Sequence, residues 1–256
     1  MPHKISSIII AKNEAENIGR CIESQLNCID EIILIVDSQT TDNTAEIAGK
    51  FENVKIEITD WKGYSATKQF AVEKATNQWI FWIDADEEVT PELCDELNEW
   101  KKSGEEKFSA YKVARRAFFL GRWIKHSGWY PGRVTRLFNK HKARFNDNQV
   151  HEGLQVEGAI ANLKNDLNHY TDPDIEHYYE KFNRYTSLAA EEMFKAGKTS
   201  SLSDLIIRPL FLFFKMYILK KGFLDGKEGF MLAVFSSNYV FTKYAKLTEM
   251  NKTRKK

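Results

Sequence analysis

Short apolar runs alternate with segments of helical spacing over the first hundred residues of the chain. The apolar runs predict four strands, over Ser6–Ala11, Glu31–Asp37, Val54–Ile58 and Trp79–Asp84. The intervening segments predict helices over Glu14–Leu26, Thr41–Phe51, Tyr64–Ala75 and, capped by Thr90, from Pro91 to about Lys101. Repeated strand–helix units indicate an α/β fold with a parallel sheet, and such sheets bind ligands at the carboxyl ends of their strands.

The rest of the chain is less regular. A stretch rich in lysine and glutamate, Lys101–Lys107, ends the first half. Beyond it the pattern predicts two strands, over Ala110–Arg115 and Val134–Asn139, and then three helices, over Asp174–Ala196, Asp204–Lys221 and Lys227–Leu247. We therefore expect a domain over residues 1–170, with halves 1–100 and 101–170, and a helical region over residues 171–256.

The stretch Trp79–Glu88 joins a buried strand to a cluster of carboxylates. Because side chains alternate along a strand, Asp84 and Asp86 are expected to project to the same side. Two carboxylates at the end of a buried strand suit Mg²⁺ or Mn²⁺, with a phosphate completing the coordination. The plainer interpretation of an isolated Asp-x-Asp is a solvated acidic turn.

Two common phosphate-binding patterns are missing from the sequence. The turn after the first strand, Ala11–Asn17, contains no glycine, which argues against a Rossmann dinucleotide site, and there is no P-loop pattern. A phosphate would therefore be held by a metal ion or by side chains. Asp37, at the end of the second strand, either caps the following helix or accepts hydrogen bonds from a base or ribose.

Charge and cysteine content indicate which partners and which cellular compartment the protein is expected to have. The net charge of +1 gives no indication of nucleic acid binding, but residues 215–256 carry ten Lys/Arg and three Asp/Glu. This basic, aromatic-rich end predicts attachment to an anionic membrane surface; packing onto the catalytic domain and a dimer interface are the alternatives. Three cysteines without Cys-x-x-Cys spacing fit a reducing compartment, so we expect a cytoplasmic protein without a signal peptide.

The order of these features resembles the GT-A glycosyltransferases of family 2, over residues 5–155. The resemblance implies an inverting enzyme that uses nucleotide sugars, with a nucleotide-binding half (1–100) and an acceptor half (101–170). It implies that the nucleotide is held by Ala11, Asn13, Glu14, Asp37, Lys68 and Asp84, with Asp84 near the ribose, and that Asp86 binds the metal, Mg²⁺ or Mn²⁺.

The catalytic base of that family is commonly in a Glu-Asp pair, which this chain lacks. It has Val150-His151-Glu152-Gly153 instead, after Arg136-Leu137-Phe138-Asn139. These residues resemble a subgroup that attaches β-linked glucose, or a similar hexose, to heptose in the lipopolysaccharide inner core. The resemblance implies Glu152 as the base, unless Glu152 only pairs with a nearby arginine. Acceptor or phosphate contacts are predicted for Trp129, Tyr130, Arg133, Arg136 and His151, with core packing or ion pairing as the alternatives.

The resemblance thus implies transfer of a hexose, with glucose as the first choice, from a UDP-sugar to a glycan or glycolipid acceptor. The predicted location is the cytoplasmic face of the inner membrane, as a peripheral protein. A sugar-1-phosphate nucleotidyltransferase is the nearest alternative, although residues 11–17 lack its usual glycine-rich basic loop. A non-catalytic carbohydrate-binding protein at the membrane is the other.

Overall fold

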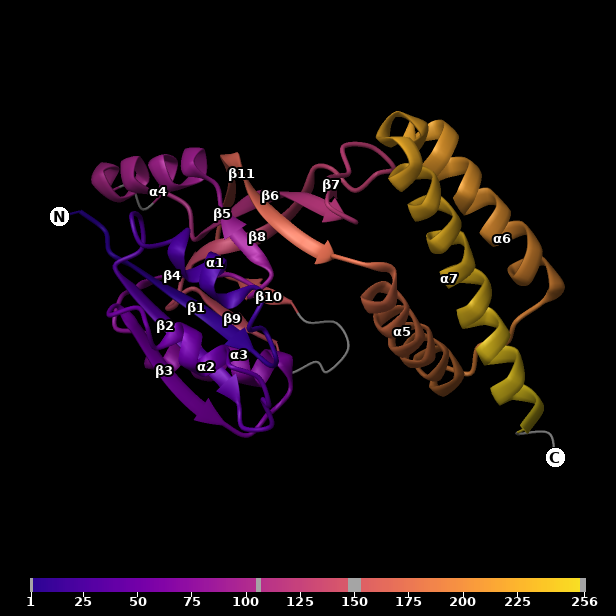
Figure 1. Cartoon of the computed structure of the whole chain (residues 1–256), viewed down its shortest axis with the longest axis horizontal. Coiled ribbons are helices and arrows are strands. Elements are labelled where there is room, and N and C mark those ends of the chain that lie inside the picture. Colours follow the sequence, from indigo (N-terminus) through magenta and orange to yellow (C-terminus); the bar gives the residue numbers. More distant parts are fainter. Residues whose placement is uncertain (1, 105–106, 147–152, 254–256) are drawn as a thin grey trace. The chain divides into compact units, whose positions relative to one another are not determined.

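The computed structural model describes residues 2–104, 107–146 and 153–253. The chain divides into two compact units (Figure 1). The first contains residues 1–115 and 133–169 and holds most of the sheet. The second contains residues 116–132 and 170–256 and is mainly helical.

The sheet is built around four parallel strands. Its strand order is β3-β2-β1-β4-β8-β6-β11-β5, and β1 pairs in parallel with both β2 and β4. From β8 onward antiparallel pairing enters, because β8 runs against β4 and β11 runs against β5. The strands are β1 (Ile5–Ala11), β2 (Glu31–Asp37), β3 (Val54–Thr59), β4 (Trp79–Trp82), β5 (Glu87–Val89), β6 (Ala110–Phe119), β8 (Gly132–Asn139) and β11 (Ile160–Asp172).

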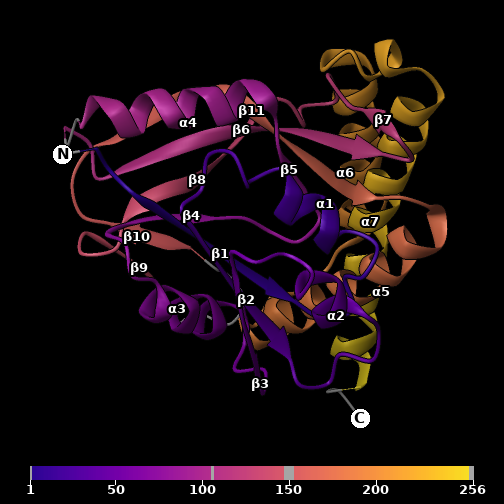
Figure 2. The ribbon, with the colours of Figure 1, turned by 60° about the vertical axis from the view of Figure 1, so that its left-hand side comes forward.

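Helices cover both faces of the parallel strands. One face packs against α1 (Ile18–Glu23), α2 (Thr44–Ala48) and α4 (Pro91–Ser103), around a core that includes Ile9, Leu34 and Phe81. The other face packs against α3 (Tyr64–Lys74) and against the small sheet formed by β9 (Ala143–Phe145) and β10 (Leu154–Val156). Figure 2 shows α3 and α4 on opposite sides of the strands. The inner parallel strands β1, β2 and β4 are therefore buried between two layers.

The predicted α/β architecture is confirmed in this unit, and local signals explain why. Strand β2 has the predicted bounds, and its seven residues are all buried. Helix α4 begins where expected, because Thr90 Oγ1 accepts a hydrogen bond from the Leu93 amide at 3.2 Å and Pro91 occupies the first helical position. The fourth strand is shorter than predicted: it ends at Trp82 and not at Asp84.

The helical unit is held together by α7 (Gly226–Thr253), which packs against α5 (Ile175–Lys195) and α6 (Leu202–Phe214). A π-helical turn, η1 (Lys215–Leu219), and a 3₁₀ turn, η2 (Gly222–Asp225), connect α6 to α7; the short strand β7 (Arg122–Trp123) pairs with the end of β6. A Cβ atom on Gly229 would lie 2.1 Å from the Gly222 carbonyl oxygen, so the close contact of α7 with η2 requires glycine. No helix within the described ranges is long and apolar enough to cross a membrane.

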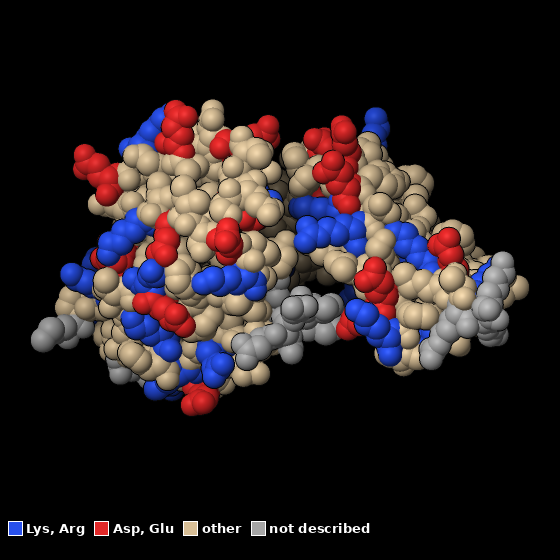
Figure 3. All heavy atoms as spheres, turned by 90° about the horizontal axis from the view of Figure 1, so that it is seen from below, with Lys and Arg blue, Asp and Glu red and all other residues tan. Residues whose placement is uncertain are grey.

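Charged side chains of both signs are mixed on the molecular surface. On the face seen in Figure 3, Lys and Arg are interspersed with Asp and Glu. This mixture is in keeping with the small net charge of +1. A broad basic face of the kind that binds nucleic acid is therefore not seen in that view.

Candidate functional site

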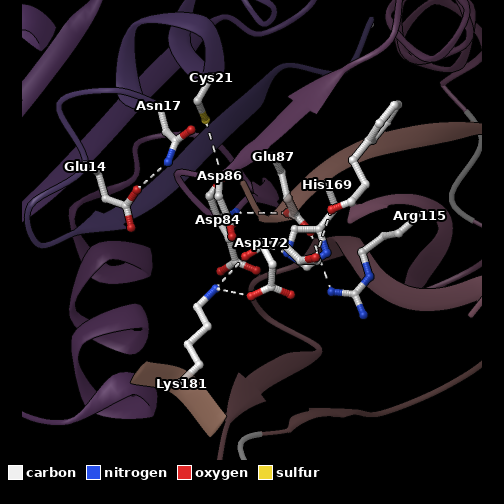
Figure 4. A network of polar contacts seen from close by, with 12 residues as sticks. Glu14, Asn17, Cys21, Asp84, Asp86, Glu87, Arg115, His169, Asp172 and Lys181 are labelled. Carbon is white, nitrogen blue, oxygen red and sulfur yellow. Dashed lines mark hydrogen bonds and ion pairs between the residues drawn. The ribbon is translucent and has the colours of Figure 1, made fainter. Parts of the chain in front are cut away.

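The acidic cluster lies on a tight turn between β4 and β5. The Glu87 amide donates to the Asp84 carbonyl oxygen at 3.0 Å, and the Asp84 amide donates to the Glu87 carboxylate, also at 3.0 Å. The turn, and not strand alternation, therefore sets the directions of Asp84 and Asp86. The strand argument for their common side was wrong, because regular pairing has already ended at Trp82. Figure 4 shows Asp84, Asp86 and Glu87 close together.

A buried arginine from β8 holds two of these carboxylates. Arg136 is 1% exposed, and its Nη2 donates to Asp84 Oδ2 at 2.7 Å and to Glu87 Oε1. Its guanidinium carbon also lies 3.7 Å from the centre of the Trp82 ring, a cation–π contact. The observed polar contacts of Arg136 are therefore with the carboxylates of the acidic turn. These contacts hold the turn in place from its buried side.

The charges of this cluster depend on one another. Burial raises the pKa of Asp84, but Arg136 and Lys68 outweigh burial and hold that pKa well below its usual range. Burial and the neighbouring Asp84 charge together raise the pKa of Glu87, against the effect of Arg136. Burial lowers the pKa of Arg136, but the two carboxylates raise it further, so the guanidinium stays charged. The turn thus contains a buried cation between two carboxylates of unlike acidity.

Asp86 has different surroundings. Its Oδ2 lies 3.4 Å from Nε2 of His169, which comes from β11, and both side chains are about one-fifth exposed or less, at 21% and 17%. His169 is aligned there because its backbone pairs with Glu87 across β5 and β11. A carboxylate and an imidazole are both groups that can bind Mn²⁺.

Asp86 and His169 are fewer groups than a complete protein metal site would need. Over the described part of the chain, no group of three or more His, Cys, Asp or Glu is placed to hold an ion. Mg²⁺ and Mn²⁺ sites of nucleotide-using enzymes commonly take only one or two protein ligands, and phosphates and waters provide the others. Asp86 and His169 therefore fit an ion that is completed by a diphosphate.

The carboxyl ends of β1 and β2 meet beside each other, as predicted. Asn13 adopts a positive φ of 55°, and its Oδ1 accepts from the Thr41 amide at 2.8 Å. The Glu14 amide donates to Thr44 Oγ1 at 2.8 Å, which joins the same two loops. The parallel register places Ala11 opposite Val36, so Asp37 follows directly at this edge.

Asp37 is held by contacts from the loops after both β1 and β2. The Gln39 amide donates to Asp37 Oδ1 at 3.0 Å, and Lys12 Nζ lies 2.9 Å from Asp37 Oδ2. The hydrogen bond from Gln39 and the Lys12 cation lower the pKa of Asp37, so it is ionised at neutral pH. Asp37 is therefore a fixed, ionised hydrogen-bond acceptor. The side chain of its cationic partner, Lys12, is 45% exposed.

Lys68 of α3 is directed toward the acidic turn. Its Nζ lies 3.8 Å from Asp84 Oδ1 and 4.1 Å from the centre of the Trp82 ring, and the residue is 6% exposed. The structure therefore brings Lys68 to Asp84, and it brings Asp37 to the loop carrying Asn13 and Glu14.

The predicted acceptor residues have other surroundings. Arg133 donates to the Leu163 carbonyl oxygen at 3.0 Å. Trp129 and Tyr130 belong to the helical unit, where Trp129 packs against Phe119 and Tyr130 against Trp123. The remaining two predicted residues, His151 and Glu152, lie outside the described residues.

Three residues of this site were not singled out from the sequence: Lys12, Glu87 and His169. Lys12 and Glu87 each adjoin a predicted motif, so their position was a usable signal. His169 had no local signal, because it reaches Asp86 only through the pairing of β11 with β5.

Known proteins of similar sequence include glycosyltransferases. The model of glycosyl transferase family 2 matches residues 6–171. The lipopolysaccharide core biosynthesis glycosyltransferase LpsC of Rhizobium meliloti is 32% identical over 249 residues, which cover 95% of this chain and 91% of LpsC. An uncharacterized glycosyltransferase of Rickettsia felis is 33% identical over 258 residues, covering 96% of this chain and 90% of the relative.

Solved structures show the same fold at low sequence identity. The mannosyltransferase PcManGT of Pyrobaculum calidifontis, in complex with GDP-Man and Mn²⁺, has a TM-score of 0.58 at 12% identity, covering 96% of this chain and 87% of PcManGT. TarS 1–349 of S. aureus, in complex with UDP, has a TM-score of 0.51 at 14% identity, covering 98% and 92%. The fold is therefore GT-A. Since the family model covers well over half of the sequence, the chain belongs to glycosyl transferase family 2.

Proposed function

We propose that the protein is an inverting, metal-dependent hexosyltransferase. It moves a hexose, with glucose as the first choice, from a UDP-sugar to a saccharide acceptor of the lipopolysaccharide core or a related envelope glycan. The observation that supports this proposal most directly is that the carboxylates of the acidic turn have different partners. Arg136 engages Asp84 and Glu87, whereas Asp86 faces His169 at 3.4 Å.

The donor nucleotide is assigned to the carboxyl ends of β1 and β2. Asp37 is ionised and fixed by Gln39 and Lys12, so it can accept hydrogen bonds from a base or ribose. Asn13 and Glu14 lie on the adjoining loop, and Ala11 ends the strand before it. Binding of a nucleotide here agrees with the general position of ligands in α/β sheets.

The diphosphate is assigned to the region of Asp86 and Lys68. Asp86 and His169 would hold Mn²⁺ or Mg²⁺, which supplies neutralising charge to the departing nucleoside diphosphate. Lys68 lies near the same turn, 3.8 Å from Asp84, and its cation adds to the positive charge available to a diphosphate. Asp84 is assigned to the ribose. Its low pKa keeps the carboxylate ionised, so it can accept hydrogen bonds from the ribose hydroxyls.

The acceptor is activated by a carboxylate, for which Glu152 is our proposal. Glu152 takes the proton from an acceptor hydroxyl as that oxygen bonds to the anomeric carbon, and the bond from that carbon to the UDP oxygen breaks. Attack opposite the leaving group inverts the anomeric centre, so an α-linked donor gives a β-linked product. A heptose of the lipopolysaccharide inner core is the proposed acceptor, supported by the name of LpsC and by the Arg136–Asn139 and His151-Glu152 motifs.

The acceptor contacts remain part of the proposal. His151, Trp129, Tyr130 and Arg133 are assigned to the acceptor or its phosphates, while the observed contacts of Arg136 support a positioning role. Because such an acceptor is a glycolipid, we propose that the enzyme acts as a peripheral protein on the cytoplasmic face of the inner membrane.

The test is a turnover assay with a panel of UDP-sugars, Mn²⁺ and a heptose-containing core oligosaccharide. We expect UDP release for one donor and a product whose anomeric proton has the β coupling in NMR spectra. Release of pyrophosphate instead of UDP would identify a nucleotidyltransferase. Absence of both donor binding and turnover across the panel would refute enzymatic hexose transfer.

A further inference from the structure

Helix α6 exposes a continuous apolar surface to solvent. Seven large apolar side chains on α6 and the following turn are between 44% and 72% exposed. They are Leu202, Ile206, Ile207, Leu210, Phe211, Phe214 and Ile218, here called the α6 stripe. Surface helices of globular proteins normally expose polar residues to solvent. An exposed helix side made of large apolar residues is therefore unusual.

Helical geometry shows that the stripe is separate from the packed face of α6. Positions 202, 206, 210 and 214 recur at intervals of four, so they lie on one side of the helix. Pro209 is buried, and its carbonyl oxygen accepts from Ser237 Oγ of α7 at 2.8 Å, which marks the packed side. Helix α6 is therefore apolar on both sides: one packs on α7 and the other is exposed.

The exposed surface continues past the helix. Leu219, Phe223 and Leu224, on η1 and η2, are 57%, 47% and 51% exposed. The buried residues of the same two turns, Met216 and Gly222, pack inward. The apolar surface thus covers the whole segment from α6 to the start of α7.

The charges along this segment are all positive. Residues 205–224 contain Arg208, Lys215, Lys220 and Lys221 and no Asp or Glu. Within the described residues, the three lysines form no ion pair, and Arg208 pairs with Asp204 just before the segment, at 2.5 Å. At about 100° per residue, Arg208 and Lys215 lie on one border of the stripe.

We infer that the α6 stripe inserts into the interfacial layer of an anionic lipid bilayer, with α6 in the membrane plane and the lysines at the headgroups. An apolar helix side with a cationic border is the pattern of interfacial helices. The inference deepens the proposed peripheral location by naming the surface that carries it. It also differs from the sequence expectation, because aromatic residues such as Phe235 and Tyr239 pack against α5.

A second copy of the chain fits this surface less well. A twofold contact through the stripe would bring the cationic borders of two copies toward each other, with no carboxylate in residues 205–224 to neutralise them. Anionic headgroups provide the missing negative charge. The lipid surface is therefore the occupant that complements both the apolar area and the charge.

The experiment is co-sedimentation of the full-length protein with vesicles, without donor or acceptor. Vesicles of phosphatidylcholine alone are compared with vesicles that contain phosphatidylglycerol, at low and high salt. We expect binding to the anionic vesicles that weakens as salt rises, because screening reduces the lysine contribution. Vesicle binding and UDP release are measured separately, so this inference and the proposed function can fail independently.

Substitutions in the stripe test its role directly. The double variant Ile207→Ser, Phe211→Ser should bind anionic vesicles more weakly, on the order of tenfold to a hundredfold, because two apolar side chains no longer insert. The matched control is Ile58→Ser on β3, since Ile58 is 62% exposed and Ile207 is 63% exposed. All three replaced side chains are exposed, so both variants should keep their fold, as circular dichroism can verify.

Two sets of charge reversals distinguish the effect of the lysines beside the α6 stripe from the effect of net charge. Lys215→Glu, Lys220→Glu, Lys221→Glu should reduce anionic-vesicle binding on the order of a hundredfold. The control triple, Lys4→Glu, Lys50→Glu, Lys102→Glu, changes net charge equally at exposed positions of the sheet unit, and we expect a much smaller loss.

A fluorescent label reports insertion itself. The native cysteines are buried, so an environment-sensitive dye can be attached to Phe211→Cys or, as control, to Ile58→Cys. We expect a blue shift with anionic vesicles at position 211 only. The inference is overturned if the wild type fails to sediment with anionic vesicles at low salt, if the Ser variants bind equally, or if light scattering shows a dimer that the Ser variants abolish.

Discussion

Replacing Arg136 by methionine should destabilise the protein strongly and in a pH-dependent way. Methionine keeps much of the packing against Trp82 but leaves the buried Glu87 with only the more distant, partly exposed Arg115, at 3.7 Å, as a cation. Glu87 would then fold in the protonated form. Proton uptake by a carboxyl of ordinary pKa 4.5 costs about 1.4 kcal/mol per pH unit above that value, so we expect a loss of about 3 kcal/mol at pH 7.

The pH dependence follows from the sign of the pKa change. Losing Arg136 raises the folded-state pKa of Glu87 further, so the folded variant holds a proton that the unfolded chain releases. Stability of the variant therefore falls as pH rises, and its loss relative to wild type shrinks to about 1 kcal/mol at pH 5. Asp84 adds little to this figure, because its side chain is 33% exposed.

Urea unfolding followed by circular dichroism, at pH 5 and pH 7, measures this loss. The matched control is Arg133→Met on the same strand, which removes an exposed side chain bonded to one backbone carbonyl and should cost less than about 1 kcal/mol. Adding Glu87→Gln to Arg136→Met should recover much of the loss at pH 7. A loss below about 1 kcal/mol, or an equal loss at pH 5 and pH 7, would refute the reasoning.

Two further predictions concern carboxylates with different roles. Glu152→Gln should retain donor binding by calorimetry but lose transfer about 10²–10⁴-fold, because glutamine cannot take the proton; near-normal transfer would redirect the search to Asp147. Glu31→Gln should lower stability at pH 7 by roughly 2 kcal/mol, because burial raises the pKa of Glu31 but bonds from Lys55, Ser6 and Thr76 lower it to about 2. That stabilisation is present above pH 4.5 and is lost as pH falls toward 2, so melting temperatures of variant and wild type should converge in acid, unlike those for Glu57→Gln, an exposed control.

The elements with local signals were predictable from the sequence. Strand β2 is an uninterrupted buried run, and α4 has a Thr90 cap followed by proline, so both could be predicted without knowledge of their neighbours. Strand β11 was not predicted, because Ile160–Asp172 mixes polar and apolar residues without strict alternation. Its position depends on pairing with β5, which is distant in sequence.

In the candidate site, too, residues with a local sequence signal could be predicted and residues placed by long-range contacts could not. Asp37 and the Asp84–Asp86 turn could be proposed from the sequence because each lies at the end of an apolar run. The buried state of Glu87 could not be predicted, because a glutamate is normally exposed and its partner Arg136 is 49 residues away. The sequence predicted an aromatic, basic C-terminal end, but it could not reveal which side of α6 packs on α7 and which side stays exposed.

The central claim, metal-dependent use of a nucleotide sugar at Asp86, is tested most directly by donor titration of Asp86→Asn beside the wild type. Calorimetry with the UDP-sugar that the turnover assay selects is run with Mn²⁺ and with EDTA. The account predicts that Mn²⁺ strengthens donor binding to the wild type and has little effect in Asp86→Asn, with the fold of both intact. Equal strengthening by Mn²⁺ in the two proteins would contradict it.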